Sequence, residues 1–327
     1  MSSLARIAQF YPGVAAVILI AVTSQFLATH YQAPALVFAL LLGMAMNFLY
    51  RQEHSRAGVD FCAKHVLRIG VAMLGAGIAV SDIADIGALG LAALIGGMIL
   101  TIASGPLLAR SLGLGRDMGL LSGGAVAICG VSAALTLSSV MPKNEENAKF
   151  TLLAVIMVTT IGALAMVGYP IIVTQLALSP EQAGYFLGGA IHDVSHVAGA
   201  GFALSETVGV EAMTVKMVRV AMLIPIAWCF LLLFNRHQGA DVSLKPPLFL
   251  IGFIALALLN SGGLIPAEWS TALTQLSKLS FLLAIVALGI KTELSGLVAH
   301  GWRPVALVLI QSVLLGSTML LWAVFMI

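Results

Sequence analysis

The chain has 327 residues, of which 60% are hydrophobic and only 9% are charged. Soluble domains contain about 45–50% apolar and about 25% charged residues, so this composition excludes an ordinary soluble enzyme and a disordered protein. The net charge of +2 also excludes a nucleic-acid-binding protein, because such proteins need a basic field. A helix that crosses a membrane needs about 20 apolar residues, so the chain has room for roughly eleven crossings and no sizeable soluble domain.

The apolar residues form long runs that are separated by charged residues, prolines and glycines. Because hydrophobicity is continuous in these runs and does not alternate, they predict helices and not a barrel. We therefore predict an all-α polytopic membrane protein with about 9–11 transmembrane helices, which form a single transmembrane transporter domain over residues 1–327. In chain order the expected segments are Pro12–Thr29, Pro34–Tyr50, Val66–Val80, Ile86–Ala109, Met118–Val140, Phe150–Ala177, Gln182–Leu204, Ala212–Phe234, Pro246–Leu264, Leu276–Ile290 and Pro304–Ile327.

Lysines and arginines are concentrated in alternate loops, and loops that carry such an excess lie in the cytoplasm. The residues concerned are Arg6, Arg51, Arg56, Lys64, Arg110, Arg116, Arg236, Lys245, Lys291 and Arg303. This pattern predicts a cytoplasmic N-terminus and an outer C-terminus. The long run after Arg6 is interpreted as the first span and not as a removable signal peptide.

One loop, Pro142–Lys149, does not fit the alternation, because it carries Lys143 and Lys149 on what would be the outer side. If segments 118–140 and 182–204 are broken or re-entrant and do not cross, this loop returns to the cytoplasm. Both segments are rich in glycine, which suits irregular backbone around a cavity. Alternatively, two lysines beside two glutamates carry little topological weight. The sequence leaves both interpretations open.

Short internal echoes favour a transporter built from inverted repeats. Gly123-Gly124-Ala125-Val126 recurs as Gly188-Gly189-Ala190-Ile191. The three cysteines (Cys62, Cys129 and Cys229) are scattered and show no metal-type spacing, and we predict no metal and no cofactor. The stripes of small residues permit a homodimer.

The most informative residues are ionisable groups at membrane depth, because each is costly unless it is solvated or paired. His192, Asp193 and His196 stand in the middle of a segment that has no other charged residue. On a continuous helix, His192 and His196 share a face, and histidine exchanges protons near neutral pH. We interpret the cluster as a proton or ion relay beside a substrate cavity. The alternative is a structural hydrogen-bond cluster.

Two cations, Lys216 and Arg219, lie three residues apart in the segment that follows. Lys216 has the reach to snorkel to an interface, whereas Arg219 lies deeper. Their functional interpretation is an anion clamp, or a partner for Asp193 or Glu206. The Gly-rich stretch that includes Cys129, Gly130 and Ser132 lets backbone approach a ligand closely. It is also the kind of stripe along which membrane helices pack.

Three motifs carry a resemblance to a known family. They are Ile128-Cys129-Gly130-Val131-Ser132-Ala133-Ala134, Gly189-Ala190-Ile191-His192-Asp193 and Lys216-Met217-Val218-Arg219-Val220. Their order and spacing resemble the YeiH-type family of bacterial inner-membrane proteins, which carries the label of sulfate exporters, and the resemblance covers nearly the whole chain. It implies a distant likeness to cation/proton antiporters and bile-acid symporters, with inverted repeats and broken helices that cross at the midplane. His196 departs from the family pattern, in which glutamine is expected.

The leading hypothesis is a secondary transporter of a small anion, of the sulfate, sulfite or organosulfonate class, coupled to a proton or Na⁺. Cys129, Gly130, Ser132, Lys216 and Arg219 are its predicted substrate-binding residues, and His192, Asp193 and His196 its predicted coupling residues. A second hypothesis is a cation antiporter of the Na⁺/H⁺ type, with Asp193 as the cation ligand. The third is an intramembrane serine protease or metalloprotease. We expect a transporter and not an enzyme.

Overall fold

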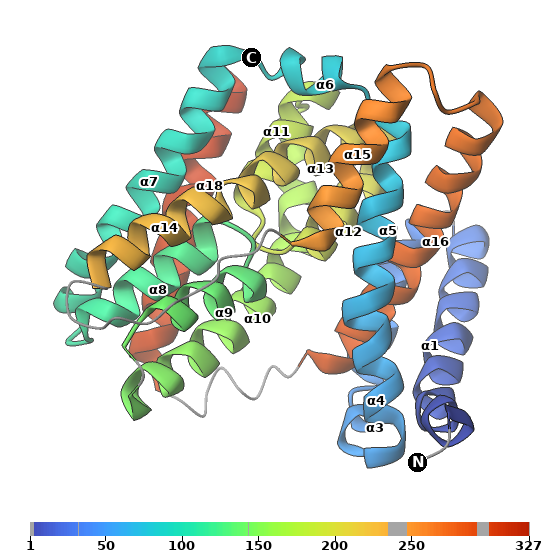
Figure 1. The fold of residues 1–327 in the computed structure, drawn as a ribbon, viewed down its shortest axis with the longest axis horizontal. Coiled ribbons are helices and arrows are strands. Elements are labelled where there is room, and N and C mark those ends of the chain that lie inside the picture. The colour runs from blue at the N-terminus through green and yellow to red at the C-terminus, as the bar shows by residue number, and fades with distance from the viewer. Residues whose placement is uncertain (1–2, 32, 143, 235–246, 293–300, 327) are drawn as a thin grey trace. The chain divides into compact units, whose positions relative to one another are not determined.

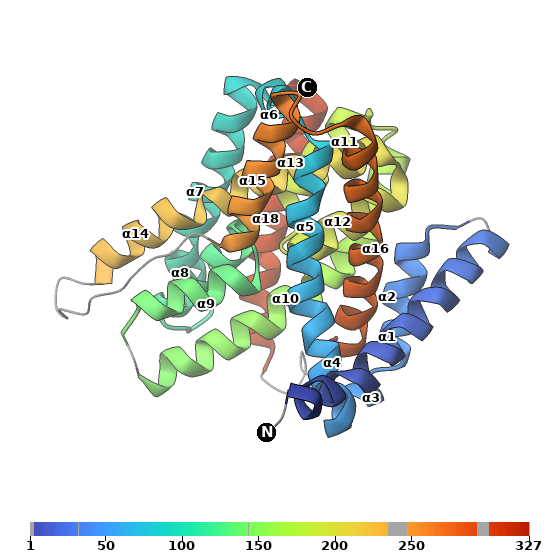
Figure 2. The same cartoon turned by 45° about the vertical axis from the view of Figure 1, so that its right-hand side comes forward.

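The computed structural model describes residues 3–31, 33–142, 144–234, 247–292 and 301–326, and the regular elements in these ranges are all helices (Figures 1 and 2). Lys143, Arg236 and Lys245, which entered the orientation argument, lie outside these ranges. The chain forms two compact units. Unit 1 comprises Met1–Asp82, Ala198–Gly209 and Pro247–Glu293, and unit 2 comprises Ile83–Val197, Val210–Pro246 and Leu294–Ile327. Each unit is thus assembled from three separate parts of the sequence. The single domain over residues 1–327 stays a prediction.

The helices that belong to unit 1 are α1 (Ser3–Tyr31), α2 (Ala35–Ala45), α3 (Phe48–Arg51), α4 (Glu53–Phe61), α5 (Leu67–Leu74), α15 (Leu248–Ser261) and α16 (Ala267–Lys291). A π-helical turn (Cys62–Val66) joins α4 to α5, and a 3₁₀ turn (Gly75–Gly77) ends α5. The helices of unit 2 are α7 (Gly87–Ser111), α8 (Arg116–Ala127), α9 (Val131–Val140), α10 (Glu145–Gln175), α11 (Pro180–Ala190), α14 (Leu223–Phe234) and α18 (Trp302–Met326). Helices α6 (Val80–Asp85), α12 (Val194–Leu204) and α13 (Glu206–Ala221) each contribute residues to both units.

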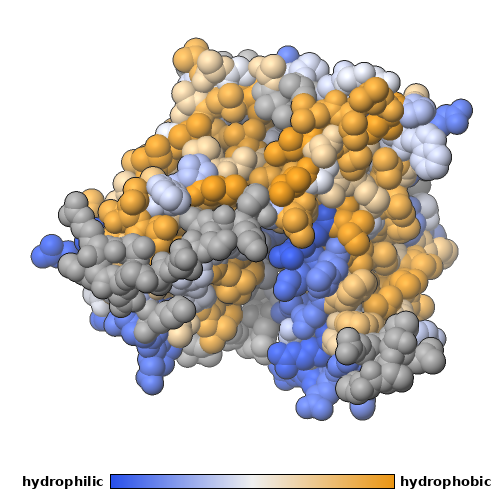
Figure 3. All heavy atoms as spheres, in the orientation of Figure 1, coloured by the Kyte–Doolittle hydropathy of each residue, from blue (hydrophilic) through white to orange (hydrophobic). Residues whose placement is uncertain are grey.

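Within the described ranges, six helical segments are long and apolar enough to cross a membrane: Gln9–Tyr31, Gly87–Ser111, Glu145–Gln175, Glu206–Phe234, Ala267–Lys291 and Trp302–Phe325. Four shorter apolar helices accompany them: Ala35–Ala45, Val131–Val140, Val194–Leu204 and Leu248–Ser261. Large apolar side chains stand on the outer faces of such helices, for example Leu107, which is 73% exposed. On the face shown in Figure 3, hydrophobic side chains cover much of the surface over α15 and α16, and hydrophilic ones gather over α3 and α4. These observations confirm the all-α polytopic membrane fold, because a soluble protein does not expose apolar surface on this scale.

Glycines bring helices of unit 1 into backbone contact. A Cβ placed on Gly43 of α2 would lie 2.5 Å from the Val286 carbonyl oxygen of α16, and one on Gly289 would lie 2.5 Å from that of Leu40. Small residues permit such close approach of membrane helices. Gly43 and Gly289 thus allow α2 and α16 to pack backbone against backbone.

Glycines also allow backbone contact between α7 and α8 in unit 2. A Cβ on Gly105 would lie 2.1 Å from the Gly119 carbonyl oxygen, and one on Gly119 would lie 2.2 Å from that of Gly105. Gln311 of α18 donates from Nε2 to the Gly119 carbonyl oxygen at 3.2 Å. Helix α8 is thereby held against two long helices.

Several predicted boundaries are corrected by the structure. The segment expected over Pro34–Tyr50 ends as a helix at Ala45, and the one expected from Val66 is preceded by helical turns from Glu53. The segment expected from Leu276 begins at Ala267. Apolar runs locate the middle of a membrane helix well, but helices extend into polar residues at the interface, where no hydrophobic signal marks their ends.

Candidate functional site

Two of the expected segments are each divided into two helices, as their glycine content predicted. The first break lies between α8 and α9, at Ile128–Gly130, and the second lies between α11 and α12, at Ile191–Asp193. Gly130 has a φ of +61°, a conformation that is costly for residues with a side chain. A Cβ at Gly130 would lie 3.5 Å from the Asp193 Oδ2 atom. The two breaks therefore meet inside unit 2.

Lys216 of α13 joins the two breaks. Its side chain is fully buried, and its Nζ donates to the carbonyl oxygens of Ile128 at 2.8 Å and Ile191 at 2.9 Å, and also to that of His192. An ammonium group has three protons to donate, and all three are thus directed at backbone carbonyl groups.

Arg219, one helical turn further on, binds the same two helix ends. Its Nε and one terminal nitrogen donate to the carbonyl oxygens of Ala127 (2.9 Å) and Val126 (2.7 Å), near the end of α8. The other terminal nitrogen donates to those of Gly188 (2.9 Å) and Ile191 (2.8 Å), near the end of α11. The last carbonyl groups of a helix lack partners and carry the negative end of its dipole. The two cations therefore cap the C-terminal ends of α8 and α11.

The carbonyl contacts correct one sequence-based alternative, in which Lys216 or Arg219 pairs with Glu206. Glu206 instead forms an ion pair with Lys278 in unit 1. Every residue has a backbone carbonyl group, so the sequence could not show which of them these two side chains bind.

Asp193 lies at the start of α12 and caps it. Its Oδ1 accepts a hydrogen bond from the Ser195 backbone N–H at 3.1 Å and one from the Ser195 Oγ at 2.7 Å. The side chain is half-buried, so the carboxylate is within reach of solvent or a ligand. Its other oxygen, Oδ2, is the atom near Gly130.

The start of α9 lies beside this carboxylate. Its N-cap residue is Gly130, so no side chain at that position caps the helix. Both Val131 and Ser132 are half-buried. Cys129, the residue before Gly130, is buried. The beginnings of α9 and α12 thus present N–H groups, one hydroxyl group and one carboxylate at a partly accessible point.

His192 and His196 do not share a helix face, and this expectation was wrong. His192 lies in the break before α12 begins, whereas His196 lies within the helix. His192 Nε2 is 2.8 Å from the Ser312 Oγ of α18. Because Ser312 donates its own proton to the Val308 carbonyl oxygen at 2.6 Å, His192 must be the donor.

His196 has a different environment. It is fully buried, and both of its ring nitrogens lack a hydrogen-bond partner among the described residues. It packs on Gly162 of α10, where a Cβ would lie 2.7 Å from the imidazole Nδ1. An imidazole with two unpaired nitrogens is unusual, because buried polar atoms are normally hydrogen-bonded.

Sequence reasoning missed Ser312 and Gly162. Ser312 had a weak signal, because Gln311-Ser312 is a polar pair within an apolar run. Gly162 had none that distinguishes it from other glycines. Among the described residues, no group of three or more His, Cys, Asp or Glu side chains is arranged to hold a metal ion.

Comparison with known proteins places this architecture in a family. Residues 12–308 match the family described as Conserved hypothetical protein 698. The chain belongs to this family. The relatives carry the name UPF0324 membrane protein, and the resemblance found in the three sequence motifs is thereby confirmed.

Three UPF0324 relatives show how far the similarity extends. TauZ of Paracoccus denitrificans is 43% identical over 93% of this chain and 92% of its own length. Protein RB0971 of Rhizobium meliloti is 41% identical over 92% of this chain and 89% of its own length. Protein CT0845 of Chlorobaculum tepidum is 39% identical over 96% of this chain and 89% of its own length. The protein is thus a UPF0324-type membrane protein with a transporter-like architecture.

Proposed function

We propose that the protein is a secondary transporter of a small anion, of the sulfate, sulfite or organosulfonate class. The observation that carries the proposal is the meeting of two broken helices around two fully buried cations, Lys216 and Arg219. Broken helices at membrane depth are a feature of transporter binding sites. The anion is expected at the start of α9, beside the half-buried Ser132 and next to the buried Cys129 and Gly130.

The charge balance of the site favours an anion. The site brings two basic side chains, Lys216 and Arg219, close to one acidic side chain, Asp193. The C-terminal helix ends of α8 and α11 and the N-terminal helix ends of α9 and α12 carry opposite partial charges of similar size, so they largely cancel. Basic groups therefore outnumber acidic groups at the site, which favours a negatively charged ligand. Lys216 and Arg219 attract the anion electrostatically, while their N–H groups continue to donate hydrogen bonds to the backbone carbonyl oxygens.

Asp193 gives a physical route to proton coupling. Protonation of its carboxylate removes the negative charge beside the start of α9 and so strengthens anion binding. By thermodynamic reciprocity, a bound anion strengthens proton binding to the same degree. Binding of the proton to Asp193 therefore favours binding of the anion, and the two are taken up together. His196, with two free ring nitrogens, is placed in the same helix to accept a proton, and His192 fixes the break through Ser312.

The test is anion binding as a function of pH, measured by calorimetry on the purified protein with sulfate and sulfite. We expect the affinity to rise as the pH falls, and Asp193→Asn to lose most of this pH dependence. A matched control is Asp117→Asn, which lies in the first turn of α8, away from the breaks. Binding of Na⁺ to the wild type in competition with protons, with no anion binding at any pH, would instead support the cation antiporter.

The intramembrane protease receives no support from the described contacts. His192 pairs with Ser312 and not with Ser132. As part of this proposal, the protein lies in the bacterial inner membrane with its N-terminus in the cytoplasm, as the distribution of lysines and arginines predicts.

A further inference from the structure

A hollow lies in unit 1. Its volume is about 280 Å³, close to the lower end of the range for small-molecule sites. Its walls come from α1, the start of α2, the end of α12, the start of α13 and the middle of α16. The lining residues are Gln25, Pro34, Ala35, Leu36, Phe202, Glu206, Lys278, Leu279, Phe281 and Leu282.

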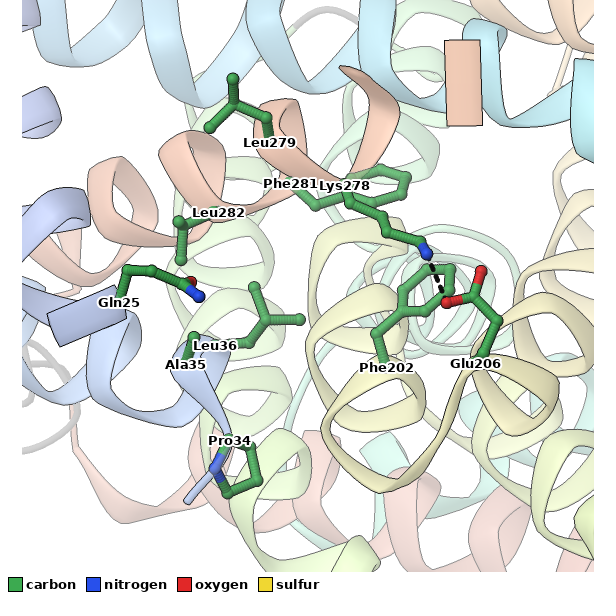
Figure 4. A pocket seen from close by; sticks show the side chains of 10 residues that line it. All are labelled: Gln25, Pro34, Ala35, Leu36, Phe202, Glu206, Lys278, Leu279, Phe281 and Leu282. Atoms are coloured by element: carbon green, nitrogen blue, oxygen red, sulfur yellow. Dashed lines mark ion pairs between the residues drawn. The ribbon is translucent and has the colours of Figure 1, made fainter. Parts of the chain in front are cut away.

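The hollow contains an ion pair in the middle of a membrane helix. Lys278 of α16 pairs with Glu206 at the start of α13, and Figure 4 shows the two side chains pointing at one another across the hollow. The side chains are 40% and 54% exposed. Lys278 lies eleven residues from the beginning of α16 and thirteen from its end (278 − 267 and 291 − 278). At 1.5 Å per residue it is more than about 16 Å from either end.

A side chain cannot snorkel that far, so the exposed surface of this pair faces the hollow. Charged groups at membrane depth are rare, and they face a cavity or a partner and not lipid. The rest of the lining is mainly apolar. Phe202 and Phe281 stack with ring centroids 5.9 Å apart, and Leu36 and Leu282 lie on the opposite side in Figure 4.

This combination selects a ligand by charge. A ligand with a single charge that binds one member of the pair leaves the other member without a partner in a mainly apolar hollow at membrane depth, which is unfavourable. A ligand with both charges satisfies Lys278 with its anionic group and Glu206 with its cationic group. Its carbon chain packs against the leucines, and its ammonium group lies near the ring of Phe202, which adds an attraction of cation–π type.

We propose that this hollow is a binding site for a small aliphatic zwitterion. The site is distinct from the proposed anion site and does not rest on the proposed function. The free solute and the headgroup of a zwitterionic lipid share this chemistry, and the experiment distinguishes them.

The test measures binding of three matched probes to the full-length protein in detergent: 4-aminobutyrate, butyrate and butylammonium. All three have a four-carbon chain, and they differ in whether it carries a carboxylate group, an ammonium group or both. We expect 4-aminobutyrate to bind at least ten times more tightly than either singly charged probe. Equal binding of butyrate, or no binding of any amino acid with an unbranched chain of three to six carbons, would overturn the proposal.

Variants locate the binding. Lys278→Gln and Glu206→Gln should each abolish it, whereas the charge exchange Lys278→Glu with Glu206→Lys should restore it, because a zwitterion binds in either direction. Leu36→Trp keeps the ion pair and fills the hollow, and should also abolish binding. Unchanged binding by Leu36→Trp would place the probe elsewhere and contradict the proposal.

Nanodiscs separate the two sources of the ligand. If the natural occupant is a lipid headgroup, phosphatidylethanolamine should weaken 4-aminobutyrate binding relative to phosphatidylglycerol. Equal affinity in the two lipids identifies a free solute as the occupant.

Discussion

The hydrogen bonds of Lys216 and Arg219 explain how this chain keeps two cations in its interior, because their N–H groups are directed at backbone carbonyl groups. Together the two side chains make seven hydrogen bonds to backbone carbonyl oxygens (three from Lys216 and four from Arg219). These oxygens lie at or beside the ends of α8 and α11, where the helix dipole is negative. The two cations therefore stabilise the broken helices and also make the electrostatic potential of the site positive.

Replacement of Lys216 by methionine tests this structural role. The variant leaves the carbonyl groups of Ile128 and His192 without this donor, whereas that of Ile191 still accepts from Arg219. Each orphaned buried group costs about 1–3 kcal/mol. We expect Lys216→Met to lower the midpoint of thermal unfolding in detergent by several degrees. Lys149→Met, at an exposed position, should leave the midpoint unchanged. An unchanged midpoint for Lys216→Met would show that the lysine does not cap the helices.

The histidine at position 196 gives a second prediction at this scale. The YeiH-type pattern leads us to expect glutamine here, and a glutamine side chain also carries one acceptor and one donor. We therefore expect His196→Gln to retain at least half of the wild-type transport rate and to shift its pH profile, because one titratable group is lost. A pH profile identical to that of the wild type would exclude His196 from the coupling.

At the scale of the elements, the sequence predicted that two segments are broken, but it did not predict the residue at which each helix breaks. Glycine content marked both segments, but Gly123, Gly124 and Gly130 were equivalent candidates for the first break. The break is at Gly130 because the carbonyl groups before it are held by Lys216 and Arg219, and these residues lie about ninety positions further on. Such long-range contacts leave no local pattern, which is also why the shared face of the two histidines was predicted wrongly.

Backbone contact between α7 and α8 gives a prediction at the element scale. A larger side chain at Gly119 meets the Gly105 carbonyl group and forces the helices apart. We expect Gly119→Leu to destabilise unit 2 by several kcal/mol, seen as loss of folded, monodisperse protein on size-exclusion chromatography. Gly96→Leu is the matched control in α7, because a Cβ at Gly96 has no neighbour within 4 Å. Equal yields of the two variants would refute the close packing.

For the whole molecule, composition alone predicted the fold class, because a chain with 9% charged residues has too little polar surface to be soluble. The division into two units had no such signal. Each unit combines three segments that are separated in the sequence, and apolar runs identify helices without showing which of them pack together.

Topology is tested by labelling the start of α10. If the segments over 118–140 and 182–204 are re-entrant, the exposed Lys149 lies in the cytoplasm. In a Cys229→Ser background, where Cys62 and Cys129 are buried, we expect Lys149→Cys to react with an impermeant maleimide only after the cells are opened. Reaction in intact spheroplasts would show that the segment crosses the membrane.

The most direct test of the central claim is uptake of labelled sulfite or sulfate into proteoliposomes under an imposed pH gradient, with proton movement recorded at the same time. The account predicts that anion and proton enter together in the wild type. It also predicts that Asp193→Asn still exchanges anions between the two sides but no longer responds to the gradient. Uptake by Asp193→Asn that remains driven by the pH gradient would contradict the account.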